Sequence, residues 1–150
     1  MKKEAAPSSR RKARVFALQA LYEEDISGHA LGLCLDRLRR DEPVSKPTVA
    51  FALRLTQGIY YRRNDLDALI VKFAPAWPVK DLSVVDRNIL RMAIFETVFS
   101  QETPLKVAIN EAVELAKTFG SESSPRFVNG VLGSVVESRK DSFGPPDIAC

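Results

Sequence analysis

The residues with the clearest chemical character in this sequence are basic, and they gather at the amino terminus. Positions 1–14 hold six basic side chains against one acid, so this segment, the basic arm, has a net charge of +5. Positions 15–150 have a net charge of −2. A local excess of positive charge beside a near-neutral body indicates a contact with a polyanion. The basic residues of the arm are Lys2, Lys3, Arg10, Arg11, Lys12 and Arg14.

The charges from Arg10 onward open a predicted helix that runs to about Glu24 and is capped by Ser8 or Ser9. At about 100° per residue, basic side chains share one sector of this helix with an aromatic ring, away from the apolar face. Cations hold RNA phosphates, and an exposed ring offers a stacking surface for an unpaired base. A terminus that only solubilises the protein is the alternative. The sector contains Arg11, Arg14, Leu18 and Tyr22.

A second candidate lies at the start of the last predicted helix. Arg126 and Phe127 follow the polar stretch 121–124, and the backbone N–H groups at a helix start favour a phosphate. Phe127 fits either of two roles, stacking on a base or packing in the core, because its spacing matches the apolar face of the helix. Tyr22 has the same two interpretations, because its neighbour Leu18 suggests that their sector is partly buried.

The sequence has no pattern typical of an enzyme or of a metal site. His29 is the only histidine, so neither a histidine-based triad nor a zinc site is predicted. The glycines form no phosphate-binding loop after a strand. The two cysteines, Cys34 and Cys150, lack metal-ligand spacing and are not expected to form a disulfide. We therefore expect a non-catalytic protein without a cofactor.

Helical periodicity dominates the chain, and strand alternation is almost absent. We predict an all-α domain, residues 1–138, with six or seven helices. The stretch 75–78 breaks the pattern and separates two lobes, at about 8–74 and 79–138. Residues 139–150 are predicted to be disordered. No apolar run is long enough for a membrane span, and no secretory signal is visible, so we expect a cytoplasmic protein. Helices are expected to begin near Pro47, Pro104 and Ser124, with a stop at Gly120. Two more are expected to begin after the caps Asp65 and Ser83, the latter with Asp86 three residues later as in a capping box.

Four segments, in this order and spacing, resemble the NusB transcription antitermination family. The resemblance covers about residues 8–137. The first segment is the basic motif with the Ala-Leu-Gln-Ala-Leu-Tyr run that follows it, and the third is the most recognisable. The segments are Arg10–Tyr22, Val85–Arg91, Pro104–Lys117 and Phe127–Leu132.

The resemblance implies two small helical bundles packed together. It also implies binding of boxA, a short single-stranded RNA element in ribosomal RNA leaders, jointly with NusE, which is also a small-subunit ribosomal protein. Such complexes load on RNA polymerase and suppress premature termination. Both monomers and homodimers are compatible with the resemblance.

Carried over by motif, the resemblance implies an RNA surface of eight residues, of which Asp86 is also a candidate contact for the protein partner. The loop before the last helix departs from the family pattern, with Ser123 where many members carry an acid and Arg126 where lysine is common. The eight residues are Arg10, Arg11, Lys12, Arg14, Tyr22, Asp86, Arg126 and Phe127.

Two other classes of function stay open at this point. Similar helical domains precede some RNA cytosine methyltransferases, but this chain has no cofactor-binding βαβ unit and no catalytic cysteine motif, so the enzymatic half is absent. The remaining alternative is a stand-alone helical module for RNA binding or protein interaction.

Overall fold

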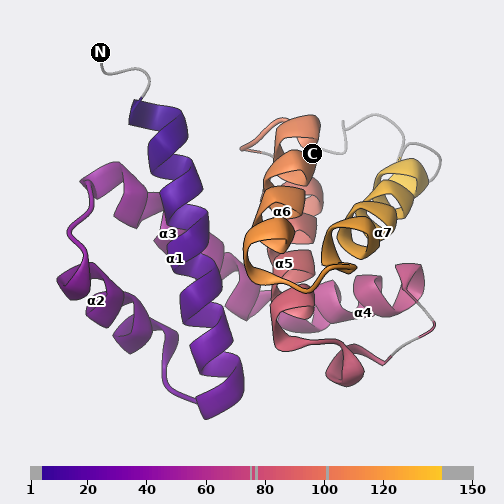
Figure 1. Cartoon of the computed structure of the whole chain (residues 1–150), viewed down its shortest axis with the longest axis horizontal. Coiled ribbons are helices and arrows are strands. Elements are labelled where there is room, and N and C mark those ends of the chain that lie inside the picture. Colours follow the sequence, from indigo (N-terminus) through magenta and orange to yellow (C-terminus); the bar gives the residue numbers. More distant parts are fainter. Residues whose placement is uncertain (1–4, 75, 77, 101, 140–150) are drawn as a thin grey trace. The chain divides into compact units, whose positions relative to one another are not determined.

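The computed structural model describes residues 5–74, 76, 78–100 and 102–139, without the side chains of residues 5–8. Every regular element in these ranges is helical (Figure 1), which confirms the predicted all-α fold. The tail predicted to be disordered lies outside the described residues from position 140 onward. The elements are α1 (Ala5–Ser27), α2 (Leu31–Asp41), α3 (Lys46–Tyr61), α4 (Arg63–Phe73), the 3-10 turn η1 (Val79–Asp81), α5 (Val84–Ile94), the π-helical segment η2 (Phe95–Ser100), α6 (Leu105–Phe119) and α7 (Ser124–Ser138).

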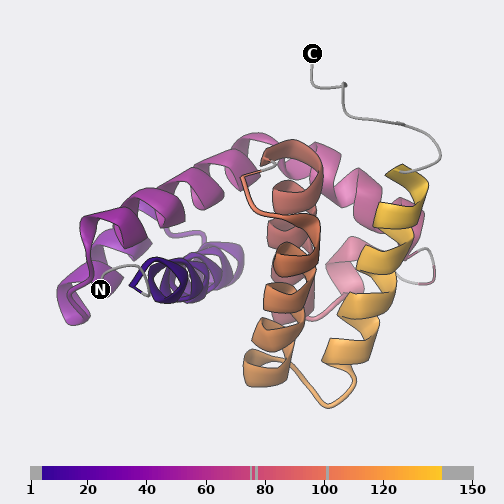
Figure 2. The same cartoon turned by 90° about the horizontal axis from the view of Figure 1, so that it is seen from above.

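The chain divides into two compact units, residues 1–63 and 64–150. In the first unit, α1 packs against both α2 and α3. In the second, α5, α6 and α7 pack against one another (Figure 2). The boundary predicted from the sequence lies instead at 75–78, which places α4 in the first lobe. The structure groups α4 with the second unit, where Asp67 of α4 pairs with Arg91 of α5.

Helix α1 begins earlier than predicted, at Ala5 rather than after Ser8 or Ser9. Pro7 is compatible with this start because a residue in the first turn needs no N–H partner. The helix ends where Gly28 adopts a left-handed φ of 81° and its N–H donates to the Glu24 carbonyl, at 2.9 Å. The apolar face of α1 is buried as the spacing indicates, through Ala13, Phe16, Ala17, Ala20 and Leu21.

The caps show where local sequence sets the helix starts. The Ser83 hydroxyl accepts a hydrogen bond from the Asp86 N–H at 3.0 Å, which confirms the predicted cap of α5. The prediction that Asp65 caps the fourth helix is wrong, because α4 starts at Arg63 and Asp65 lies within its first turn. Only Arg62 separates α3 from α4, and its N–H still donates to the Gly58 carbonyl of α3.

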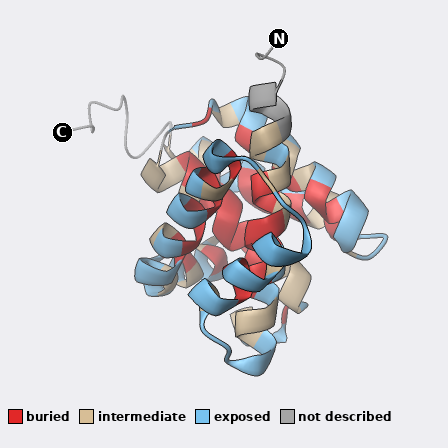
Figure 3. Ribbon diagram, turned by 90° about the vertical axis from the view of Figure 1, so that its left-hand side faces the viewer, coloured by how far each residue is buried: buried red, intermediate tan, exposed pale blue. Residues whose placement is uncertain are grey.

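Each unit has its own apolar interior. Figure 3 shows the buried residues concentrated on the inner sides of the helices. The described helices include none that is both long and apolar enough to cross a membrane. The largest fully buried apolar side chains are Leu21, Leu55 and Ile59 in the first unit, and Leu66, Ile70, Ile89, Leu90, Met92, Ile94, Val128 and Leu132 in the second.

Candidate nucleic-acid interface

Five of the eight predicted RNA-binding residues belong to α1, but they do not share one exposed sector. Arg11 is exposed, and Tyr22 is 42% exposed, so Tyr22 is not a core residue. Between them, Arg14 and Leu18 are each only 3% exposed. The middle of this sector is therefore covered, in agreement with the interpretation that the sector is partly buried.

Arg14 lies in a cluster of cations around Phe51 of α3. The guanidinium carbons of Arg10, Arg14 and Arg54 lie 4.3, 5.2 and 5.5 Å from the centroid of the Phe51 ring. Such positions are favourable because the face of an aromatic ring carries partial negative charge. Phe51 itself is 3% exposed. We call these four residues the Phe51 cluster. Phe51 and Arg54 could not be found from the sequence, because their relation to the arm comes from the packing of α1 against α3.

Lys12 has a different partner. Its ammonium group forms an ion pair with the carboxylate of Glu42, the residue that caps the end of α2. The two side chains are 42% and 56% exposed. Exposed ion pairs of this kind contribute little to stability, about 0–1 kcal/mol, so a stronger anion can compete for Lys12.

The second predicted site lies at the start of α7. Arg126 is exposed, and Phe127 is half-buried, with its N–H donating to the Ser123 carbonyl at 3.1 Å. The half-buried ring is compatible with both predicted roles of Phe127, in the core and toward a base.

The loop that leads into α7 is short and tightly packed. Gly120 ends α6, and the Ser124 hydroxyl accepts a hydrogen bond from the Ser121 N–H at 2.9 Å. A Cβ atom on Gly120 would lie 2.5 Å from the Ser124 Oγ, closer than real contacts allow. Glycine at this position thus permits the close approach that sets the start of α7.

Asp86, in the first turn of α5, has an unusual environment. Its Oδ1 is buried and has no hydrogen-bond partner within the described part of the chain. The side chain as a whole is half-buried. Its negative charge is favourable near a helix N-terminus, but a buried carboxylate oxygen without a donor is costly.

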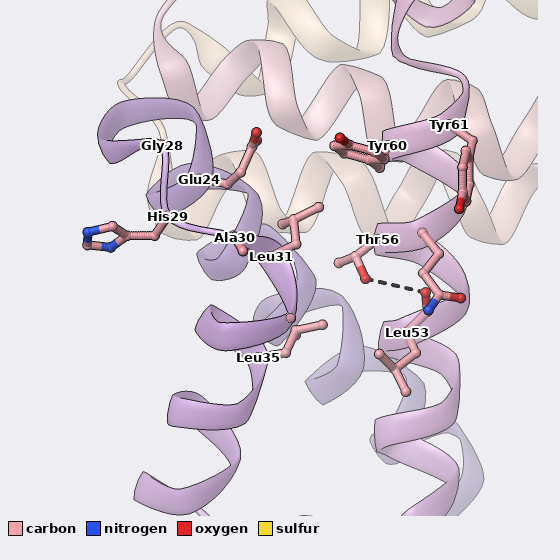
Figure 4. Close-up of a pocket in the computed structure, with 12 residues that line it drawn as sticks. Glu24, Gly28, His29, Ala30, Leu31, Leu35, Leu53, Thr56, Tyr60 and Tyr61 are labelled. Carbon is pink, nitrogen blue, oxygen red and sulfur yellow. Dashed lines mark hydrogen bonds between the residues drawn. The ribbon is translucent and has the colours of Figure 1, made fainter.

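The structure also shows a pocket that the sequence analysis did not anticipate. A pocket of about 350 Å³ lies between the α1–α2 turn, α2 and α3 (Figure 4). Tyr60 and Tyr61 line it, with ring centroids 5.8 Å apart and ring planes at 79°. These rings are 59% and 83% exposed. The two adjacent tyrosines are visible in the sequence, but nothing in the sequence indicates that α2 forms the other side of the pocket.

The end of α1, beside this pocket, contains a carboxyl group with a strongly lowered pKa. Hydrogen bonds from Arg37 and then His29 lower the pKa of Glu23 from 4.5 to about 2. The same carboxylate raises the pKa of Arg37. Burial raises the pKa of the Cys34 thiol, which makes it a weaker nucleophile. No group of three His, Cys, Asp or Glu side chains in the described ranges is arranged to hold a metal ion.

Comparison with known sequences gives a consistent set of relatives. Residues 11–137 match the NusB family. The transcription antitermination protein NusB of Dehalococcoides mccartyi (strain CBDB1) is 52% identical over 135 residues, which cover 90% of this chain and 94% of that protein. The NusB protein of Chloroflexus aggregans is 48% identical over 131 residues, which cover 86% and 87%.

Solved structures agree with the sequence relatives. NusB of T. maritima superposes with a TM-score of 0.79 at 36% identity, over 85% of this chain and 90% of that one. A structure of the antitermination factors NusB and NusE in complex with dsRNA matches with a TM-score of 0.81 at 25% identity, over 87% and 98%. The family resemblance inferred from the four sequence segments is confirmed. With most of its length matched at this level, the chain belongs to the NusB family.

Proposed function

We propose that this protein acts in transcription antitermination by binding boxA-type single-stranded RNA together with NusE, within an antitermination complex on RNA polymerase. Its relatives are transcription antitermination proteins. Membership of this family also agrees with the prediction that the protein is not an enzyme. The observation that carries the proposal is the match, at a TM-score of 0.81, to a NusB that is bound to NusE and RNA.

The charge distribution supports separate roles for different residues in RNA binding. The basic arm supplies phosphate contacts through Arg10, Arg11, Lys12 and Arg14, and these contribute affinity without reading sequence. Tyr22, which is exposed, and Phe127, at the start of α7, supply base or sugar contacts. Arg126 adds positive charge near the N–H groups of the same helix start. A body of net charge −2 binds RNA weakly by itself, so a protein partner completes the surface.

Asp86 has a separate role in the proposal. A carboxylate repels RNA phosphates, so the accessible part of the half-buried Asp86 side chain is better suited to a donor from NusE or to a base N–H group. Asp86→Asn keeps the shape of the side chain but removes its charge. If the contact is with NusE, this variant weakens NusE binding measured without RNA. Unchanged NusE binding with weaker RNA binding assigns Asp86 to the RNA.

The proposal is tested by fluorescence polarisation with labelled boxA RNA, a scrambled single strand of equal length, and a boxA duplex, each with and without NusE. We expect boxA to bind more tightly than the scrambled strand, and NusE to increase the difference. The duplex is included because the related solved complex contains dsRNA. Equal affinity for all three RNAs in the presence of NusE would contradict the proposed function.

Two further aspects of the proposal follow from this role. Action on nascent transcripts places the protein in the cytoplasm. The family resemblance is also compatible with a homodimer, which light scattering tests against the monomer mass of 16.7 kDa.

A further inference from the structure

The Phe51 cluster brings three positive charges to one place in the first unit. The guanidinium carbons of Arg10, Arg14 and Arg54 all lie within 5.5 Å of the ring centroid of Phe51. No two of them are therefore more than about 11 Å apart, a range over which charges near a protein surface still interact.

The two helix segments that carry the cluster contain no acidic side chain. Helix α3, which carries Phe51 and Arg54, contains neither Asp nor Glu. In α1, the stretch 5–22 that carries Arg10 and Arg14 also contains none. In these two facing segments every charged side chain is basic, and such a distribution of charge favours an anion.

We propose that Arg54 of α3 acts with Arg10 and Arg14 as a binding site for phosphates of the RNA backbone, and that Phe51 is the positioning residue of this site. The inference rests on the proposed function and extends the RNA surface from α1 to a residue of α3 that the family motifs did not mark. The chemistry is that of phosphate recognition, since the planar guanidinium group can donate two parallel hydrogen bonds to phosphate oxygens.

The burial pattern gives the residues different parts in this site. Arg54 is exposed and Arg10 is half-buried, so both are accessible to a ligand. Arg14 is 3% exposed and contributes its positive charge from beneath the surface. Phe51, equally buried, fixes the place where the guanidinium groups meet. A site whose arginines are held before binding loses less side-chain entropy when the phosphate arrives.

The first experiment measures RNA affinity as a function of salt concentration, with NusE present, for Arg54→Gln and for Arg40→Gln. Arg40 is an exposed arginine of α2 in the same unit, and its substitution changes the net charge equally. We expect Arg54→Gln to weaken boxA and scrambled RNA alike by several fold and to reduce the log–log salt slope by about 0.7, the value for one phosphate contact on a single strand. Arg54→Lys should keep most of the slope because it keeps the charge.

The variant Arg11→Gln shows whether a negative result contradicts only this inference or the proposed function as well. If Arg11→Gln lowers the salt slope while Arg54→Gln behaves like Arg40→Gln, the inference is overturned and the proposed function stands. If the wild-type protein binds no boxA RNA with NusE, both are overturned.

The part of Phe51 is tested by comparing Phe51→Leu with Leu55→Ala. Both residues are buried on α3, so both substitutions lower stability, and circular dichroism shows which preparations are folded. We expect Phe51→Leu to reduce the salt slope, because the arginines are no longer held together. Leu55→Ala should leave the slope as in the wild type. Equal slopes for the two variants would overturn the positioning role.

A probe without bases distinguishes phosphate chemistry from base recognition. Inorganic tripolyphosphate should raise the melting temperature of the wild-type protein and of Arg40→Gln, because a ligand that binds the native state stabilises it. The rise should be clearly smaller for Arg54→Gln. Equal rises for all three proteins would overturn the assignment of phosphate binding to the cluster.

Discussion

Arg91 of α5 holds the carboxylate of Asp67 in α4 with two hydrogen bonds. The Nε–H donates to Oδ1 at 2.8 Å, and Nη2 donates to Oδ2 at 3.0 Å. The third nitrogen, Nη1, donates to the Asn88 Oδ1 at 3.1 Å. Arg91 is only 5% exposed, so this guanidinium depends on its partners for compensation of its charge.

Removal of the Asp67 carboxylate should therefore destabilise the second unit strongly. Breaking a buried pair costs about 3–5 kcal/mol because the remaining charge is left uncompensated. The Asp67 side chain is 28% exposed, so water can replace part of the interaction. We expect Asp67→Ala to lower the free energy of unfolding by about 2–3 kcal/mol, measured by urea denaturation.

The matched control is Asp65→Ala, two residues earlier on α4 and exposed. It should change stability by about 0.3–1 kcal/mol, through its favourable charge in the first helical turn. Similar losses for the two variants would contradict a special role for the pair with Arg91.

Substitution by alanine should lower stability at Gly120, before α7, but should raise stability at an ordinary glycine inside a helix. In Gly120→Ala, the new methyl group would meet the Ser124 side chain, and overpacking of this kind costs about 1–3 kcal/mol. Gly133→Ala, in the middle of α7, has no atom within 4 Å of the new Cβ. That variant should gain about 0.5–1 kcal/mol because alanine favours a helix more than glycine does.

Thermal or urea unfolding measures both effects. The clash is checked by the double variant Gly120→Ala, Ser124→Gly, which removes the two Ser124 atoms that the methyl group meets and leaves the Ala116 carbonyl oxygen at 2.9 Å. If Ser124→Gly recovers none of the loss, the contact with the Ser124 side chain is not the cause of the glycine requirement.

The acid stability of the protein should depend on Glu23. Because the pKa of Glu23 is lowered from 4.5 to about 2 in the folded state, its contribution to stability is complete above pH 4.5 and is lost as the pH falls to about 2. Glu23→Gln should be less stable than the wild type at neutral pH and should lose less stability over that acid window. Urea midpoints measured across the window test this.

A control for this prediction is Glu114→Gln, which removes a carboxylate paired with Lys117 at 3.3 Å on the exposed face of α6. Exposed pairs contribute about 0–1 kcal/mol, so this variant should resemble the wild type at neutral pH. If the stabilities of Glu23→Gln and the wild type become equal at high pH and differ at low pH, the effect has the opposite sign and the prediction is wrong.

Arg11 and Arg14 should differ although both belong to the basic arm. Arg11→Ala should reduce RNA affinity and the salt slope with little change in stability, since Arg11 is exposed. Arg14→Ala should also lower the free energy of unfolding by about 1–3 kcal/mol, because it removes a buried side chain packed near Phe51. Polarisation and urea denaturation of the same preparations separate the two effects. Equal stability of the two variants would contradict the buried position of Arg14.

Phe127→Ala tests base recognition at the start of α7. The proposed role predicts a larger loss of affinity for boxA than for a scrambled strand of equal length, with circular dichroism confirming the fold. Stacking on one base accounts for about 1–3 kcal/mol. If the two RNAs lose affinity equally, Phe127 does not read the sequence.

The parts of the fold that were predictable from sequence depend on residues close together in the chain. Ser83 and Asp86 are three positions apart, and their cap was predicted correctly. The start of α1 was missed because Ala5, Ala6 and Pro7 are compatible with a first helical turn, while the serines that follow gave the more familiar cap signal. Boundaries without a distinctive side chain are set by small differences in propensity.

The candidate site was less predictable because its geometry depends on packing between helices. Periodicity placed Arg14 beside Arg11, but only the contact of α1 with α3 determines that Arg14 is buried near Phe51. Arg54 gave no signal, because an isolated arginine in an apolar helix is usually a solvated side chain. The positions of Arg126 and Phe127 follow from the local helix start and were predicted correctly.

In the ion pair between Lys12 and Glu42, the carboxylate of Glu42 competes with any other anion for the ammonium group of Lys12. Glu42 belongs to the same chain, so it is present at a high effective concentration near Lys12 and cannot be diluted away. A phosphate gains from Lys12 only the difference between its own attraction and that of the carboxylate it displaces. Weak or singly charged anions therefore gain little, whereas a polyanion that contacts several cations at once can displace Glu42. Because an exposed pair of this kind contributes only about 0–1 kcal/mol, the competition from Glu42 is weak, and it lowers the affinity for single anions more than the affinity for a polyanion.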